Sequence, residues 1–508
     1  MANAVTAFLD DPAARRGDEL AIGTSEGRVS YYDLLALVNR TGHVLRGLGV
    51  EPEQRVAIVL PDGLAWVAAF FGALRIGAVA VPLNTRLARA DWVELIRDSR
   101  ARVVIADATV ADDLREALRL VASVKAVLSA GPSAGPRGLE GLTATAPSTL
   151  EPEPVSGDDM AFWLYTSGTT GRPKAAVHLH RDLLACRHYG VEVLGATADD
   201  RVFATSKLFF AYALGNALLS PLYLGGRTFL SPAWPDPGTV ADVVAGFRPT
   251  LFFSVPTFYA RLLQADLPRD LFRSVRCAVS AGERLPEEIH ARFAERFGVE
   301  ILDGLGATET IFMVLSNRRG QVRPGSCGLP VPGTSARLLD AEGREVAPGE
   351  QRVLHVRTPS ASPAYWARVD QSRRTFVGEW FRTGDICRRD GDGYYYHCGR
   401  ADDLFKVAGL WVAPAEVVAV LMSHPGVADV GVVGLEEAPS GLVKPFAFVV
   451  PREAARPARP LVDELTALLA ERLPPHQRPR RITVVPELPR TATGKLQRFL
   501  LRERGGAS

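Results

Sequence analysis

Apolar residues recur along the first third of the chain with two different spacings. Residues 30–48 place leucines and valines at helical intervals, whereas residues 55–60 (RVAIVL) form a short apolar run that ends at Pro61, as a buried strand would. The same succession of helix-like and strand-like segments continues at residues 63–76, 78–82, 91–98 and 101–106. This rhythm predicts an α/β fold with largely parallel sheets, because strands separated by helices usually pair in parallel.

The alternation resumes after a stretch rich in Gly, Pro, Ala and Ser at residues 129–154, which indicates a surface loop or a linker. Residues 160–165 are strand-like and lead into a polar loop. Three later apolar runs, at residues 251–256, 276–283 and 299–309, end in small or polar residues. Ligands in open α/β sheets gather at strand ends of this kind, so these positions are candidates for a site.

The alternation of helix-like and strand-like segments changes near residue 390. The segment DGDGYYYHCGR at 390–400 combines a turn with aromatic β residues, and Pro414 opens an expected helix. The remainder has the size of a compact α+β domain. We therefore expect a large N-terminal domain of layered, largely parallel sheets and helices over residues 1–401, and a small α+β C-terminal domain over residues 402–508.

Composition narrows the class of protein. The chain has 508 residues, of which 47% are hydrophobic, and is too long for one ordinary domain. Its 59 basic and 57 acidic side chains leave a net charge of +2, which gives no sign of a nucleic-acid-binding or membrane-surface protein. A multidomain globular enzyme is the expectation.

The spacing of the cysteines and the first residues of the sequence indicate in which cellular compartment the protein is expected. The five cysteines form no CxxC pair, which argues against a disulfide framework or a zinc site. The first residues lack the basic start and apolar run of a signal peptide, and the sequence has no run of about 20 apolar residues for a membrane span. We expect a soluble cytoplasmic protein, either a monomer or a homodimer.

The polar loop at residues 165–174 reads YTSGTTGRPK. Gly168 and Gly171 permit unusual backbone geometry, and Lys174 adds a positive charge. Hydroxyl donors come from Thr166, Ser167, Thr169 and Thr170. Together these groups can cradle a phosphate. The spacing is not that of a Walker A motif, which places more residues between its glycines.

This string resembles the phosphate-binding signature of the adenylate-forming superfamily, which includes acyl-CoA synthetases, luciferases and peptide-synthetase adenylation domains. Further segments resemble its other motifs in the same order: DGLGATE at 303–309 for adenine and magnesium, WFRTGD at 380–385 for ribose, GRADDLFKVAGLWVAPAEV at 399–417 for the interdomain hinge, and PRTATGKLQR at 489–498 for the catalytic lysine. The resemblance covers nearly the whole chain. It implies that ATP and Mg²⁺ are used to convert a carboxylic acid into an acyl-adenylate.

The resemblance implies roles for the reacting end of the site. Adenylation brings together two anions, the carboxylate and the α-phosphate, so positive charge and fixed donors are required. Lys495 would bridge them, with Lys174 in the phosphate loop. Glu309 would hold Mg²⁺, which prefers oxygen ligands, and Thr308 would contact the α-phosphate.

Further residues are implied for the nucleoside. Asp385 would accept hydrogen bonds from the ribose hydroxyls, and Arg400 would add a second ribose contact. The expected adenine-lining residues are Ala281, Gly282, Glu283, Asp303 and Gly304.

The superfamily uses its small C-terminal domain in two orientations, so this domain is expected to be mobile. Asp402 matches the hinge position. Gly409 matches a glycine that lets a pantetheine arm pass during thioester formation.

The acyl pocket is implied by residues 207–226, KLFFAYALGNALLSPLYLGG. This string resembles benzoate-CoA ligases, which carry an F-A-Y-x-L-G-N segment, and an aromatic wall suits an aryl acid. The expected pocket residues are Phe210, Ala211, Tyr212, Gly215, Gly306, Ile311 and Phe312. The chain departs from that subfamily at Phe312, where benzoate ligases tend to carry a histidine. This change leaves the ring substituents of the acid open.

Three functions remain open at this point. The first is an aryl-CoA ligase with CoA as co-substrate. The second is an aryl ligase that loads a holo carrier protein on its phosphopantetheine arm. The third is a catalytically silent relative that binds a nucleotide or an aryl acid, against which the intact Lys174, Glu309 and Lys495 argue.

Overall fold

A computed structural model of the chain describes residues 3–166, 173–340, 342–403, 405–407, 410–437, 442–453, 457–489 and 496–506. These residues fall into two compact units. The first comprises Met1–Arg337, His355–Thr383 and Asp392–Tyr395, and the second Leu338–Leu354, Gly384–Gly391 and Tyr396–Ser508. The units thus interleave along the chain between residues 338 and 396, and the functional boundary expected at residues 401 and 402 stays a prediction.

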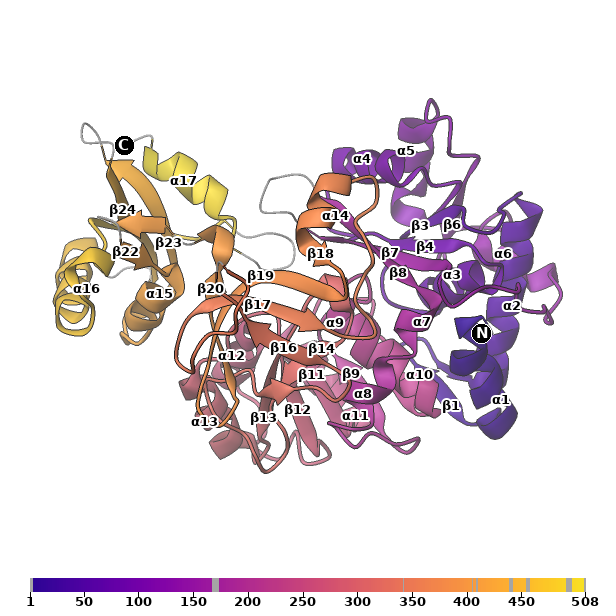
Figure 1. Cartoon of the computed structure of the whole chain (residues 1–508). Helices are drawn as coiled ribbons and strands as arrows, with labels where there is room; N and C mark the ends of the chain where they lie inside the picture. The colour runs from indigo at the N-terminus through magenta and orange to yellow at the C-terminus, as the bar shows by residue number, and fades with distance from the viewer. Residues whose placement is uncertain are drawn as a thin grey trace. The chain divides into compact units, whose positions relative to one another are not determined.

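The first unit contains a six-stranded sheet of order β6-β5-β3-β4-β7-β8 (Figure 1). Its strands are β3 (Arg55–Val59), β4 (Val79–Pro82), β5 (Val103–Asp107), β6 (Ala126–Ala130), β7 (Met160–Thr166) and β8 (Lys174–Leu179). All neighbours pair in parallel except β7 and β8, which form an antiparallel pair. The strands predicted at residues 55–60, 78–82 and 101–106 are confirmed.

Helices cover both faces of this sheet, which explains why its strands are apolar throughout. Alternate strand residues pack against α2 (Tyr31–Gly47) and α3 (Leu64–Arg75) on one face, and against α4 (Arg89–Ser99) and α5 (Ala108–Leu118) on the other. The helices expected at 30–48, 63–76 and 91–98 are therefore confirmed. Shorter helices of this region are α6 (Leu139–Thr145) and α7 (His180–Leu183).

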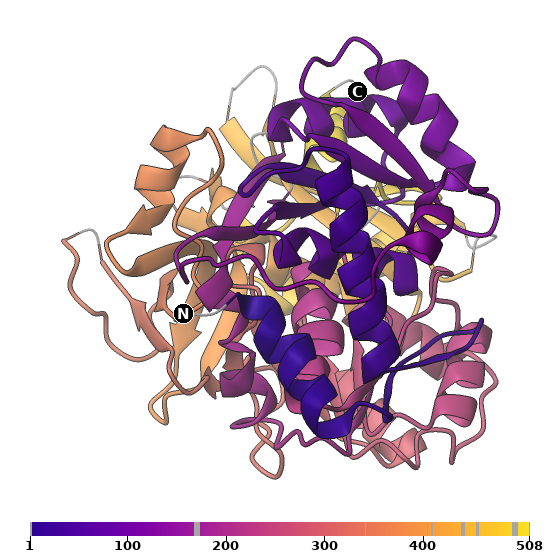
Figure 2. The same cartoon turned by 90° about the vertical axis from the view of Figure 1, so that its right-hand side faces the viewer.

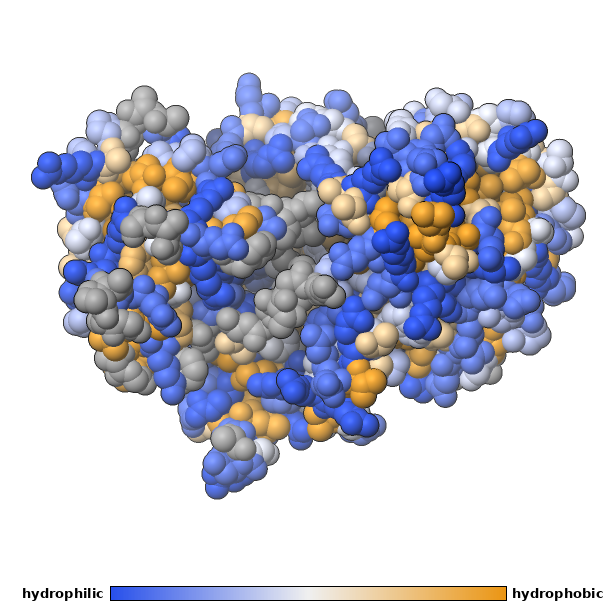
Figure 3. Space-filling model, turned by 90° about the horizontal axis from the view of Figure 1, so that it is seen from above, coloured by the Kyte–Doolittle hydropathy of each residue, from blue (hydrophilic) through white to orange (hydrophobic). Residues whose placement is uncertain are grey.

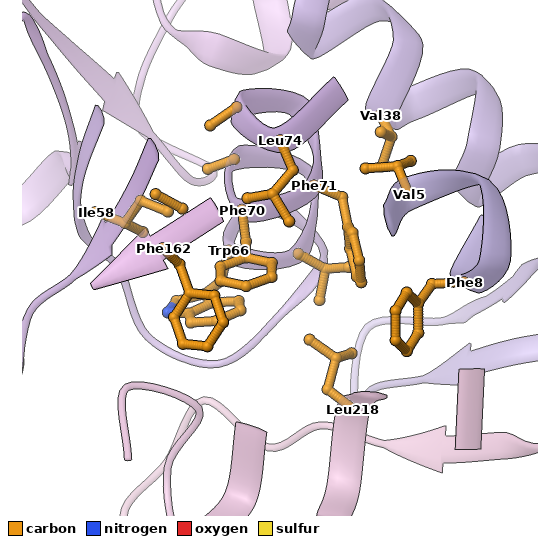
Figure 4. Packing of buried hydrophobic residues seen from close by; sticks show 14 of the residues in the cluster. Val5, Phe8, Val38, Ile58, Trp66, Phe70, Phe71, Leu74, Phe162 and Leu218 are labelled. Atoms are coloured by element: carbon orange, nitrogen blue, oxygen red, sulfur yellow. The ribbon is translucent and has the colours of Figure 1, made fainter. Parts of the chain in front are cut away.

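Helix α3 is buried on every side. Trp66 stacks on Phe70 with ring centroids 5.2 Å apart, and both rings have no exposed surface. In Figure 4, Phe162 approaches from the sheet, Phe8 from the N-terminal helices and Leu218 from a segment much later in the chain. The N-terminal helices are the π-helix η1 (Thr6–Asp10) and α1 (Asp11–Arg16), drawn in indigo and turned toward the viewer in Figure 2.

The second sheet of the first unit has nine strands in the order β15-β14-β13-β12-β11-β9-β10-β1-β2. Its bounds are β1 (Leu20–Gly23), β2 (Arg28–Ser30), β9 (Arg201–Ala204), β10 (Arg227–Phe229), β11 (Leu251–Ser254), β12 (Cys277–Ser280), β13 (Ile301–Gly306), β14 (Met313–Ser316) and β15 (Leu329–Pro330). Strands β1, β10, β9, β11, β12 and β13 pair in parallel. Ser254, Ser280 and Asp303 lie in register, so the strands formed by the three later apolar runs are adjacent in this sheet.

Helices also cover this sheet on both faces. One face carries α11 (Pro237–Phe247), α12 (Pro256–Gln264) and α13 (Glu287–Phe297), and the other carries α8 (Cys186–Gly190) and the segment of α9 (Ala211–Ala213), η2 (Leu214–Leu219) and α10 (Ser220–Leu224). The predicted α/β class with largely parallel sheets is confirmed.

A five-stranded sheet draws on the residue ranges of both units. Its order is β16-β17-β19-β18 with β20 beside β19, and its strands are β16 (Ser335–Leu338), β17 (Arg352–Arg357), β18 (Phe376–Val377), β19 (Trp380–Arg389) and β20 (Tyr395–Arg400). Helix α14 (Val369–Thr375) precedes β18, and the 3-10 turn η4 (Ala401–Asp403) follows β20.

The rest of the second unit is a small α+β assembly. The hairpin of β21 (Phe405–Val407) and β22 (Leu410–Val412) precedes a three-stranded sheet of β23 (Val427–Glu437), β24 (Leu442–Pro451) and β25 (Arg481–Val484). Helices α15 (Pro414–Met422) and α16 (Ala458–Arg472) pack on this sheet through Val417, Leu421, Leu461 and Leu465. The turn η5 (Pro475–Gln477) and helix α17 (Arg498–Gly506) complete it. Helix α15 begins at Pro414, as predicted.

The visible face in Figure 3 is mostly hydrophilic, with hydrophobic residues in separate patches. Within the described ranges, no helix is both long and apolar enough to cross a membrane. Four of the five cysteines are buried, and Cys398 is partly exposed.

Acid is expected to destabilise the first unit through His180, which lies 2% exposed where β8 meets α7. Its Nδ1 accepts a hydrogen bond from the Ala4 amide at 3.3 Å, and burial lowers the pKa of the imidazole to about 4 against the opposing charge of Asp159. In the unfolded chain this histidine binds a proton near pH 6.5, whereas in the folded chain it does so only near pH 4. The free energy of unfolding therefore decreases as the pH falls from about 6.5 to about 4. The loss is about 2 kcal/mol between about pH 7.5 and pH 5.

Urea unfolding followed by tryptophan fluorescence at both pH values would measure this loss. In His180→Asn the amide oxygen can replace Nδ1 as the acceptor, but the side chain does not titrate. The variant should lose less stability on acidification than the wild type, and equal losses in the two proteins would contradict the assignment.

Candidate active site

The predicted phosphate loop follows strand β7 and precedes strand β8 in the sequence. Thr166 at the end of β7 is opposite Lys174 at the start of β8. The loop residues predicted to bind phosphate, Ser167, Gly168, Thr169, Thr170 and Gly171, lie outside the described residues. On its other side β8 is joined to the segment 364–366, because the Val177 amide donates to Ala364 O at 3.1 Å and the Trp366 amide to Ala175 O at 2.9 Å. This pairing brings Tyr365 next to Lys174.

Lys174, Glu309 and Tyr365 form a compact polar group. The Tyr365 hydroxyl donates to Glu309 Oε1 at 2.6 Å, and Lys174 Nζ lies 4.0 Å from the same oxygen. The Lys174 ammonium also sits 3.8 Å from the centroid of the Tyr365 ring, within the range of a cation–π contact. Glu309 is only 8% exposed, so these neighbours surround its carboxylate. The structure thus brings Lys174 and Glu309 together, two residues predicted from separate motifs.

The composition of this group tests whether it suits Mg²⁺. A site made by protein alone needs several oxygen ligands, and the described ranges contain no cluster of three His, Cys, Asp or Glu that could hold a metal. Magnesium carried by nucleotide phosphates needs only one or two carboxylates. Glu309 next to Lys174 fits that second kind of site.

Glu309 lies on a tight turn between β13 and β14. The 3-10 turn η3 (Thr308–Thr310) follows β13, and two glycines allow the hairpin to close. A Cβ at Gly304 would lie 2.8 Å from Leu315 O, and one at Gly306 would lie 2.9 Å from Phe312 O. The glycines of the DGLGATE segment are therefore required by close backbone approach.

The turn ends in a strained residue. Ile311 has φ +58° and ψ −55°, and the Phe312 amide donates to Thr310 O at 2.5 Å across it. This is a γ-turn with its central residue at positive φ, a rare conformation that is especially unfavourable for a β-branched side chain. Such strain costs about 1–3 kcal/mol and persists only where neighbours hold it in place.

The predicted acyl pocket residues meet on the other side of this turn. Gly215 lies in the π-helix η2, and a Cβ there would be 2.9 Å from two carbons of the Phe312 ring and 3.3 Å from Ile311 O. Ala211, Ile311 and Phe312 belong to one buried apolar cluster. The structure therefore places three predicted pocket residues, Gly215, Ile311 and Phe312, together at one contact.

The two aromatic residues expected to flank the acid differ in their surroundings. The Tyr212 hydroxyl lies 2.9 Å from Val279 O and 3.1 Å from Ser254 O, and burial holds its pKa well above the usual range. Backbone carbonyls thus engage the hydroxyl of Tyr212. Phe210 is partly exposed and packs edge-on against Phe209, with centroids 4.5 Å apart.

The residues predicted to line adenine follow the ends of β12 and β13. Ser280 and Asp303 are neighbours in register, so Ala281 and Gly304 continue from adjacent strands. Gly282 has φ +91°, a backbone conformation that suits glycine. Burial raises the pKa of Asp303 to about 8, although hydrogen bonds from the Leu285 and Gly304 amides and from the Ser280 side chain act in the opposite direction. Glu283 is partly exposed.

The predicted ribose residues form a separate group in the second unit. Asp385 Oδ1 accepts from Arg400 Nη1 at 3.0 Å and lies 3.3 Å from His397 Nε2. Burial alone would raise the pKa of Asp385, but the hydrogen bond from His397 and the charge of Arg400 outweigh it and lower the pKa. The structure thus brings Asp385 and Arg400 together, as their motifs suggested.

Several residues predicted for the site lie outside the part of the chain that the structure describes. Lys495 and Gly409 are outside the described residues, and so is the side chain of Asp402. Conversely, sequence reasoning did not find Tyr365, which contacts Glu309, or His397, which contacts Asp385. His397 lies only three residues before Arg400, and its position on β20 was the one signal available.

Comparisons with known proteins agree with this arrangement. The model of the family described as AMP-binding enzyme matches residues 9–366, and that of the AMP-binding enzyme C-terminal domain matches residues 416–495. The 3-hydroxybenzoate–CoA ligase of Aromatoleum sp. (strain CIB) is 40% identical over 508 residues, covering 99% of this chain and 96% of that protein. The benzoate–CoA ligase of Thauera aromatica is 39% identical over 493 residues, covering 96% of this chain and 93% of that protein.

The fold comparison gives the same result. The crystal structure of a benzoate CoA ligase from Burkholderia xenovorans LB400 has a TM-score of 0.91 and 40% identity, covering 99% of this chain and 100% of that chain. The motifs, the fold and these relatives lead to one conclusion: the chain belongs to the AMP-binding enzyme family, the adenylate-forming superfamily, and resembles its benzoate–CoA ligases over nearly its whole length.

Proposed function

We propose that this enzyme activates an aromatic carboxylic acid of the benzoate type with ATP and transfers the aryl group to the thiol of CoA. The first step forms an aryl-adenylate and releases pyrophosphate. The second step forms the aryl-CoA thioester and releases AMP. The relatives named for benzoate and hydroxybenzoate support this substrate class.

One observation carries the proposal. The short turn at residues 308–312 has Glu309 beside Lys174 on one side and Phe312 against Gly215 on the other. A single rigid segment therefore links the group suited to phosphate and magnesium with the aromatic group suited to an aryl acid. An enzyme that joins a carboxylate to an α-phosphate needs these two subsites next to each other.

The chain's own side chains would act as follows in the first step. Lys174 and the phosphate loop would hold the triphosphate, and Thr308 would contact the α-phosphate. Lys495 would neutralise the two anions that must approach one another, while Asp385 and Arg400 would hold the ribose. Mg²⁺ held by Glu309 would neutralise charge on the phosphates.

For the second step we propose a domain movement. The C-terminal part, residues 402–508, would turn about Asp402 after adenylation, and Gly409 would then line the path of the thiol arm. Such a movement removes Lys495 from the adenylate and admits the acceptor.

The pocket favours an aryl acid without polar ring substituents. Phe312 offers no hydrogen bond where related ligases tend to carry histidine, and carbonyls already engage the hydroxyl of Tyr212. A buried ring hydroxyl left without a partner costs about 1–3 kcal/mol. Benzoate should therefore be preferred to its hydroxylated forms by about 10-fold or more in kcat/KM.

A pyrophosphate-release screen would test the proposal with benzoate, 3- and 4-hydroxybenzoate, phenylacetate, cinnamate and short fatty acids, each with ATP, Mg²⁺ and CoA. We expect the highest rate with a benzoate-type acid. A fatty acid as the best substrate would contradict the aryl pocket. The absence of pyrophosphate exchange with every acid would favour a catalytically silent relative.

The acceptor needs a separate measurement. AMP release should rise strongly when CoA is added to the enzyme, ATP and the preferred acid. Holo carrier proteins in place of CoA provide the comparison. Turnover with carrier proteins and none with CoA would replace the CoA ligase with a carrier-loading ligase.

A further inference from the structure

The turn that carries Glu309 is held by a clamp on its backbone. Three consecutive carbonyls, those of Thr308, Glu309 and Thr310, each accept a hydrogen bond from a residue far away in sequence. The donors are His178 Nε2 at 2.9 Å, the Ser362 amide at 2.8 Å and Ser360 Oγ at 2.6 Å, respectively. These bonds fix the path of the turn just before the strained Ile311.

The two side-chain donors, His178 and Ser360, are buried and in contact with neighbouring residues. His178 is completely buried, stacks on Phe162 with ring centroids 4.9 Å apart, and has its Nδ1 3.4 Å from Asp182 Oδ2. Because a carbonyl can only accept, Nε2 must carry the hydrogen that reaches Thr308 O. Ser360 is 1% exposed. Both donors are thus desolvated side chains with a defined partner.

The hydrogen bond from Ser360 Oγ to Thr310 O is the one that acts most directly on the strained backbone of Ile311. Thr310 O accepts from Ser360 Oγ and also from the Phe312 amide across the γ-turn. With the serine hydroxyl in place, rotation of the Thr310 carbonyl away from the γ-turn would leave a buried donor without a partner. The hydroxyl therefore opposes the relaxation that Ile311 would otherwise favour.

We infer that His178 and Ser360 are positioning residues, which hold the turn at 308–312 in its strained form so that Glu309 and Phe312 face their two subsites together. The inference rests on the proposed function. Neither residue would contact the substrate. Its consequence is that loss of one clamp bond disturbs the phosphate end and the aryl end of the site at once.

The sharpest test is Ser360→Ala, read out as binding. Benzoyl-sulfamoyl adenosine, an unreactive mimic of the aryl-adenylate, spans both ends of the site, and its Kd can be measured by calorimetry. We expect Ser360→Ala to raise this Kd about 5- to 10-fold, since one hydrogen bond no longer opposes relaxation of the turn.

Ser362→Ala is the matched control. The Ser362 hydroxyl donates to Ala364 O at 2.9 Å, whereas its backbone amide makes the clamp bond to Glu309 O. Alanine keeps that amide, so the Kd should stay within about twofold of the wild type. His178→Gln, which can keep a donor near the position of Nε2, should likewise bind more tightly than His178→Met.

The outcomes separate the two proposals. An unchanged Kd in Ser360→Ala, equal weakening in Ser362→Ala, or equal binding by His178→Gln and His178→Met would each overturn the clamp, while leaving the proposed function in place. Failure of the folded wild-type enzyme to bind the mimic would overturn the proposed function and the clamp with it. Should the His178 variants fail to fold, the serine variants alone decide the question.

Discussion

Replacing Lys495 with alanine should slow aryl-adenylate formation by about 10²- to 10³-fold, the usual cost of removing one electrostatic group from a reacting centre. The carboxylate and the α-phosphate are both anions, and without the ammonium their approach has no compensating charge. The second half-reaction should change much less, because the proposed domain movement takes Lys495 away before the thiol attacks. Single-turnover pyrophosphate release measures the first step, and thioester formation from pre-made adenylate measures the second.

Lys444→Ala is a suitable control, since it removes the same charge from strand β24 of the second unit. It should leave both half-reactions close to wild-type rates. Equal losses in the two half-reactions of Lys495→Ala would contradict the two-orientation scheme. A wild-type rate of adenylation in that variant would remove Lys495 from the mechanism altogether.

Glu309→Gln should lower the rate of adenylation by about 10²-fold and raise the Mg²⁺ concentration needed for half-maximal rate. The amide oxygen of glutamine can still accept the hydrogen bond from Tyr365, so the position of the side chain is preserved while its charge is lost. Pyrophosphate exchange measured over a range of Mg²⁺ concentrations would show both effects.

Tyr365→Phe provides the complementary change. It removes the hydroxyl that donates to Glu309 Oε1 at 2.6 Å but keeps the ring beneath Lys174. Its rate should fall less than that of Glu309→Gln, with Mg²⁺ dependence close to the wild type. If Glu309→Gln had the same Mg²⁺ dependence as the wild-type enzyme, the assignment of Glu309 to magnesium would be wrong.

The sequence predicted the sheets of the first unit well because buried parallel strands leave a simple pattern. Residues 56–60 are apolar on both faces, since helices cover both sides of β3, and this produces an uninterrupted run. Gly304 and Gly306 lie in a recognisable motif, and the structure gives the reason, which is close contact with the backbone of the facing strand.

Other features depend on contacts that no local pattern reveals. Tyr365 reaches Glu309 because its segment pairs with β8, nearly 200 residues earlier in the chain. His178 lies on an apolar strand and appears as an ordinary core residue until its bond to Thr308 O is seen. The positive φ of Ile311 is likewise invisible in the sequence, because a β-branched residue is among the least expected at such a position.

The all-round burial of helix α3 has a consequence for synthesis on the ribosome. A helix without a polar face has no favourable exposed state, and Leu218, one of the residues that cover it, follows its last turn by about 140 residues. At about 5–20 residues per second, the ribosome needs roughly 7–30 s to synthesise the chain from the end of α3 to Leu218. During this interval the nascent chain displays a strongly apolar segment, and residues 64–75 are expected to be a main point of contact for cellular chaperones.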